Sequence, residues 1–87
     1  MGESFLLKCE IHGSDLYGKV AKAILDHDGI TDEGIANYTG ILSIDLVRMI
    51  LKDLKWKDLI VSNLKFNRIK KFYSLTYQVN IKNNSFQ

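Results

Sequence analysis

The sequence predicts an α+β domain in which three helices are followed by a small antiparallel β-hairpin. Residues 15–54 carry apolar side chains at the three-four spacing of helices, separated by residues that typically begin and end helices. Residues 72–79 instead alternate apolar and polar side chains, which is the pattern of a half-buried strand. The chain has 87 residues, of which 46% are hydrophobic and 25% charged, with no proline; this composition predicts one small globular domain over residues 1–87.

Two helices joined by a tight turn are predicted in the middle of the chain. The hydroxyl of Thr31 can cap the first helix, and Asp32 and Glu33 follow in its first turn, where the helix dipole favours negative charge. Gly40 suits the left-handed residue that ends a helix, and Ser43 can cap the next one. The inward stripe of this second helix consists of Ile44, Val47, Ile50, Leu51 and Leu54. These residues predict a helix-turn-helix.

A third helix is predicted upstream, capped by Ser14 or Asp15 and ending near Asp28 and Gly29. Ile30 is a single apolar residue between that helix and the next, where a short strand is expected. Residues 1–13 are predicted to form a short helix or an extended arm laid on the domain. The inward positions of the upstream helix are Leu16, Val20, Ala23 and Ile24.

The hairpin is predicted to join a strand at residues 59–61 to the strand at 72–79 through a polar, basic tip at 67–71. The second strand is expected to be an edge strand protected by its polar outer face, and the polar tail at 80–87 is expected to fray. The elements together predict a winged helix-turn-helix; a plain helical bundle is the alternative, against which the alternation in residues 72–79 argues. The predicted core consists of Leu16, Val20, Ile24, Ile35, Val47, Ile50, Leu51, Leu54, Ile60, Leu75 and Tyr77.

Charge is distributed unevenly along the chain, although the total is only +2. Residues 1–47 carry three lysines against eight acidic side chains, a net charge of −5. Residues 48–71 carry eight Lys and Arg side chains against two aspartates, a net charge of +6. A basic cluster of this kind in a nearly neutral domain is typical of nucleic-acid binding.

Seven cationic side chains of the basic segment are the candidate DNA contacts. Three follow one line along the exposed side of the second helix of the helix-turn-helix, and four lie on the hairpin, from which they would reach phosphates flanking the groove. The alternative for the helix group is a solvated helix face without a ligand. The candidates are Arg48, Lys52, Lys55, Lys65, Arg68, Lys70 and Lys71.

Trp56 lies just past the second helix of the helix-turn-helix. Its ring is predicted to cover the edge of the core, and the alternative is an exposed anchor for a protein partner.

Several kinds of chemistry lack the residues they need. His12 and His27 have no ligand-spaced partners, Cys9 is the only cysteine, and no glycine-rich loop could cradle a phosphate. We therefore predict no metal, no cofactor and no enzymatic activity. No apolar run approaches the ~20 residues of a membrane span, so no membrane contact is predicted.

The run from Leu16 to Val61 also carries a family resemblance, which covers about half the chain. Its Ile-Ala, Thr-Gly, Leu-Val-Arg and closing Leu-Ile-Val motifs are similar to those of the N-terminal winged helix of the largest subunit in the RNA polymerase III-specific heterotrimer. They equally resemble the alpha subunit of transcription factor IIE and its archaeal counterpart, transcription factor E. The wing of factor E usually ends in an aromatic run containing tryptophan, whereas this chain has FYSLTYQV.

The resemblance implies a role in transcription initiation, with contacts to RNA polymerase subunits. The basic residues themselves predict weak, non-specific binding to duplex DNA. It implies a nuclear protein, or a cytoplasmic one if the chain is archaeal or viral. Two other functions remain open: a free-standing regulator that dimerises, for which residues 80–87 offer no dimerisation helix, and a protein-interaction module without DNA binding. The isolated domain is expected to be a monomer.

Overall fold

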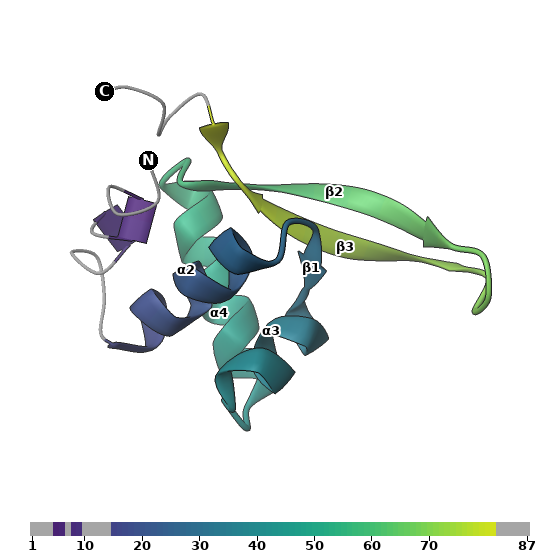
Figure 1. Ribbon diagram of the computed structural model, residues 1–87, viewed down its shortest axis with the longest axis horizontal. Helices are drawn as coiled ribbons and strands as arrows, with labels where there is room; N and C mark the ends of the chain where they lie inside the picture. Colours follow the sequence, from purple (N-terminus) through teal and green to yellow (C-terminus); the bar gives the residue numbers. More distant parts are fainter. Residues whose placement is uncertain (1–4, 7, 10–14, 82–87) are drawn as a thin grey trace.

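The computed structural model describes residues 5–6, 8–9 and 15–81, and it has the predicted winged-helix arrangement. The helices pack together on one side of a three-stranded antiparallel sheet, and a long hairpin extends beyond them (Figure 1). Residues 5, 6, 8 and 9 are helical, while the rest of the predicted N-terminal arm lies outside the described residues. The elements are α2 (Asp15–Asp26), β1 (Ile30–Thr31), α3 (Asp32–Thr39), α4 (Ile44–Trp56), β2 (Ile60–Asn67) and β3 (Phe72–Val79).

The capping residues of the helix-turn-helix are confirmed. Thr31 is the N-cap of α3, and its hydroxyl accepts a hydrogen bond from the backbone amide of Gly34 at 3.0 Å. Gly40 ends the helix with φ 78°, a left-handed conformation that glycine adopts without steric cost. Ser43 caps α4 by accepting a hydrogen bond from Leu46 N at 3.2 Å. These contacts satisfy backbone groups that helix ends leave unpaired.

The sheet differs from the prediction in two ways. Its strand order is β1-β3-β2, so β3 is the central strand and its prediction as an edge strand is wrong; β2 is the long edge strand. β2 also continues to Asn67, well past the predicted residues 59–61, because residues 62–67 pair with β3. Most of this added length is exposed, so pairing between strands and not burial stabilises it.

The core lies between the helices and the near half of the sheet. Most predicted core residues are buried, and Leu16 packs against them partly buried. The prediction that Leu75 belongs to the core is wrong, because this residue is 46% exposed. Leu75 pairs with Leu64 on the far half of the hairpin, which the helices do not cover. Phe5, which is not among the predicted core residues, is fully buried in the core, and so is Cys9, as expected of a thiol in an apolar stretch.

No single helix among the described residues is long and apolar enough to cross a membrane. Helices α3 and α4 meet the length and composition criteria for a membrane span only when they are taken together as a bent pair. The apolar residues of this pair include Ile35 and Leu51, which are buried in the core.

Candidate nucleic-acid interface

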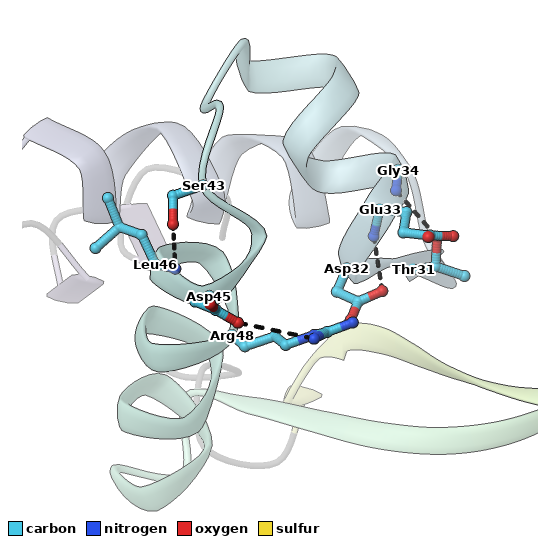
Figure 2. Close-up of polar contacts among 8 residues, drawn as sticks. All are labelled: Thr31, Asp32, Glu33, Gly34, Ser43, Asp45, Leu46 and Arg48. Carbon is cyan, nitrogen blue, oxygen red and sulfur yellow. Dashed lines mark hydrogen bonds and ion pairs between the residues drawn. The ribbon is translucent and has the colours of Figure 1, made fainter.

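Arg48 on α4 is held by carboxylates of its own chain. Its Nε lies 2.8 Å from Oδ2 of Asp32 at the start of α3, and its Nη1 lies 3.9 Å from Oδ1 of Asp45 (Figure 2). The hydrogen bond to Asp32 raises the pKa of Arg48 further above its usual value. The guanidinium is therefore already paired, and a nucleic acid would have to compete with Asp32 for it.

Lys52 and Lys55 continue the predicted cationic line along α4, and both are exposed. In the part of the chain that the structure describes, neither ammonium group lies within ion-pair distance of a carboxylate. These two lysines, unlike Arg48, remain available to an anionic ligand.

The register of the hairpin separates its cations from its apolar side chains. Lys65 pairs with Ser74, so both side chains lie on one face of the ribbon. Leu64 and Phe66 lie on the other face, which nearer the helices carries the buried Ile60 and Tyr77. Lys65 therefore points away from the side of the sheet on which the helices pack, and the structure does not bring it together with the cations of α4.

The face that carries Lys65 contains a polar groove of about 260 Å³. The groove lies between β1 and the hairpin, and the hydroxyl groups on it belong to Thr31, Ser74 and Thr76. Hydroxyl and ammonium groups are the side-chain types that contact phosphate and sugar oxygens in protein–DNA complexes. From the sequence, the Thr31 hydroxyl is predicted to cap a helix and no ligand is predicted for Ser74 or Thr76, because serine and threonine that alternate in a strand are also common on a solvated face.

Three of the predicted cations lie in the hairpin tip and are exposed to solvent: Arg68, Lys70 and Lys71. The side chain of Asn67 orders the tip: its Oδ1 accepts hydrogen bonds from the backbone amides of Ile69 and Lys70, both at 2.9 Å. No acidic residue follows Asp58 in the sequence, so nothing on this part of the chain offsets their charge.

Trp56, the last residue of α4, is 85% exposed, so the prediction that its ring covers the core edge is wrong. The inward stripe of α4 ends at Leu54, and Trp56, two residues later, points to the solvent side of the helix. The alternative, an exposed aromatic side chain available to a partner, agrees with this position.

A separate hollow of about 490 Å³ lies where α2, β1 and α3 meet, and His27, Asp28 and Tyr38 are among its lining residues. The Tyr38 hydroxyl donates to Asp26 at 2.9 Å and lowers the pKa of that carboxyl. The His27 ring packs edge-on against Tyr38, with 4.6 Å between ring centroids. The described residues hold no cluster of three or more His, Cys, Asp or Glu side chains that could bind a metal.

Part of the chain is similar to a curated protein. A segment of 48 residues, 55% of this chain, is 50% identical to a protein named Transcription factor E from the archaeon Cenarchaeum symbiosum (strain A). The match spans 28% of that protein, so this chain corresponds to only part of its length. No protein-family model matches the chain. Of the two resemblances, the similarity favours transcription factor E, and it gives no support to the RNA polymerase III-specific subunit.

Proposed function

We propose that this chain is the winged-helix domain of a transcription initiation factor similar to archaeal transcription factor E. The observation that supports this proposal is the 50% identity over 48 residues to a protein of that name, together with the winged-helix fold. In this role the domain binds duplex DNA weakly, without sequence preference, and docks on RNA polymerase. The archaeal source of the relative favours the cytoplasm over the nucleus as its location.

The hairpin is the proposed DNA-binding element. Its tip cations and the adjoining polar groove carry groups of the kinds that contact phosphates, and no acidic residue lies on the hairpin itself. If about three of these cations contact phosphates together, the plot of log affinity against log salt should have a slope near −3. The dissociation constant for any duplex should then lie around 10⁻⁴–10⁻⁶ M at physiological salt.

Fluorescence anisotropy with several duplexes of unrelated sequence tests the DNA contact. Lys70→Glu combined with Lys71→Glu should weaken binding to every duplex about equally and flatten the salt slope, since phosphate contacts carry no base information. Lys19→Glu combined with Lys22→Glu makes the same change in net charge on α2 and should have a smaller effect. Equal losses for both pairs would mean that net charge, and not the wing, controls binding.

Polymerase docking is proposed to involve Trp56. Its exposed ring at the end of α4 has the size and position of an interface anchor. Trp56→Ala should weaken binding to purified archaeal RNA polymerase, whereas Met49→Ala, at a residue 57% exposed on the same helix, should not. Surface-plasmon resonance with immobilised polymerase would measure both, and unchanged binding of Trp56→Ala would remove Trp56 from the interface.

A protein-interaction module without DNA binding is the second candidate function. The specific observation in its favour is the pairing of Arg48 with Asp32, which occupies the cation best placed to contact bases. Retained polymerase binding with no measurable duplex binding would select this second function over the first.

A further inference from the structure

The tip of the wing presents an isoleucine to solvent. Ile69 is 92% exposed, although turns of this kind are usually filled by Gly, Asn, Asp or Ser. The turn that contains it joins β2 to β3, two eight-residue strands whose ribbon projects beyond the helices (Figure 1). A single exposed apolar side chain is common on protein surfaces, so its meaning depends on how it is held and what surrounds it.

Ile69 is held in a fixed position. The Asn67 side chain accepts hydrogen bonds from the amides of Ile69 and Lys70, and the Asn67 carbonyl accepts one from Lys71 N at 2.8 Å. Lys71 itself adopts a left-handed conformation with φ 60°, which turns the chain back into β3. A β-branched side chain has few rotamers, so Ile69 is a stiff projection on an ordered turn.

The immediate sequence neighbours of Ile69 are cationic. Arg68 precedes it and Lys70 and Lys71 follow it, while the whole chain after Asp58 contains no carboxylate side chain. A ligand that matches this tip is a polyanion, which pairs with the three cations, and it also has an apolar gap that admits one side chain, which accepts Ile69. Duplex DNA has both features, because an apolar residue flanked by Lys and Arg can enter between base pairs from the minor groove and unstack them.

An anionic membrane also combines negative charge with an apolar interior. Other exposed apolar side chains of the hairpin lie along the strands and not in the turn, among them Phe66 and Phe72. Ile69 is the apolar side chain of the turn itself, and one side chain is sufficient to separate one base step. The cations that flank Ile69 in the turn favour the DNA step, and binding to an anionic membrane is one outcome of the test below.

We propose that Ile69 is a wedge that the wing inserts between base pairs of duplex DNA, while Arg68, Lys70 and Lys71 contact the flanking phosphates. The wedge rests on the proposed DNA contact and adds to it a local distortion of the duplex. Flexible pyrimidine–purine steps such as TA are the easiest to unstack, so the wing favours them by deformability and without base-specific hydrogen bonds.

The test uses a short duplex with 2-aminopurine at a central TA step, because unstacking raises the emission of this base. The wild-type domain at saturation should raise the emission. Ile69→Ser should remove most of this rise even at saturation and weaken binding about fivefold, as expected for losing one partly buried apolar side chain. Leu42→Ser is the matched control, since Leu42 is 102% exposed in the turn between α3 and α4 and no cation adjoins it in sequence. It should behave as the wild type does.

The outcomes separate the wedge from the proposed function. Duplex binding without a rise in emission, or an equal rise with Ile69→Ser, overturns the wedge and leaves the DNA contact standing. The absence of any duplex binding overturns the DNA contact together with the wedge. Ile69-dependent binding to phosphatidylserine vesicles that is stronger than binding to DNA overturns the wedge in favour of a membrane contact. Equal thermal unfolding midpoints of wild type and Ile69→Ser show that the fold is retained.

Discussion

At the residue scale, the carboxylate of Asp53 connects two helices. Its Oδ2 accepts a hydrogen bond from the Tyr17 hydroxyl of α2 at 2.7 Å, and its Oδ1 lies 2.7 Å from the Lys57 ammonium. The hydrogen bond to Asp53 is the largest cause that raises the pKa of Tyr17 above its usual value of 10.0. A half-buried contact of this kind ties the start of α2 to the end of α4.

Tyr17→Phe should lower the free energy of unfolding by about 1 kcal/mol at neutral pH, the usual net contribution of a hydrogen bond. Because folding raises the pKa of Tyr17, the bond stabilises the protein below the unfolded-state pKa near 10 and is lost as pH rises through the folded-state pKa. Urea titrations at neutral pH and above pH 10.0 should therefore show the difference between wild type and variant shrinking. Tyr73→Phe, at a residue 65% exposed, is the control; a difference independent of pH would contradict the assignment.

The pair Asp32–Arg48 gives a second prediction at this scale. Asp32→Asn should tighten duplex binding roughly two- to threefold at low salt, because it releases Arg48 and removes a negative charge beside it. The asparagine oxygen can still accept the hydrogen bond that Asp32 Oδ1 now receives from Glu33 N at 2.7 Å. Glu33→Gln makes the same charge change without breaking an ion pair of Arg48. Anisotropy titrations showing equal gains for both variants would mean that only the net charge matters.

At the element scale, α4 and β3 differ in how far the sequence predicts burial. Leu51 on α4 is 1% exposed, and Leu51→Ala or Val47→Ala should cost about 1–4 kcal/mol of unfolding free energy, as buried truncations do. Leu75→Ala on β3 should cost less than about 1 kcal/mol, because the helices leave Leu75 uncovered. Urea midpoints measure all three variants. A negligible change for Leu51→Ala together with Val47→Ala would contradict the position of α4 against the core.

The helices were predictable because their signals are local. Thr31, Gly40 and Ser43 act on backbone groups within four residues of themselves, so the sequence alone indicates where α3 and α4 begin and end. The strands depend on partners far away in the chain. The alternation that places Leu75 on the same face as Tyr77 is real, but alternation cannot show where the helices stop covering that face.

The sequence was sufficient to predict the exposed cations of the candidate site, but it was not sufficient to predict which of them are paired within the chain. The cations of the wing are exposed as the sequence indicates, since lysine and arginine in a turn have little alternative. The pairing of Arg48 with Asp32 joins residues from two helices, so it depends on packing between elements, which residue spacing alone does not specify. The exposure of Trp56, in contrast, follows from the spacing, because Trp56 lies two residues past Leu54, the last residue of the predicted stripe.

At the scale of the whole molecule, we expect the isolated domain to be a monomer. The described residues contain no helix beyond the core that could pair with a second copy. The exposed edge strand β2 carries Lys65, and charged residues on edge strands oppose pairing between chains. Sedimentation velocity at micromolar concentration should give a single species of 10.0 kDa. A tight dimer would instead favour a free-standing regulator that binds two half-sites.

The exposure of Trp56 also provides a spectroscopic reporter. Trp56 is the only tryptophan of the chain, and at 85% exposure its indole is hydrated, so the free domain should fluoresce at the long-wavelength end of the tryptophan range. The residue lies at the end of α4, just before β2, whereas the cations of the wing tip lie at the far end of the hairpin. A blue shift on adding polymerase, without a shift on adding duplex DNA, would show that polymerase covers Trp56 and that DNA binds away from it.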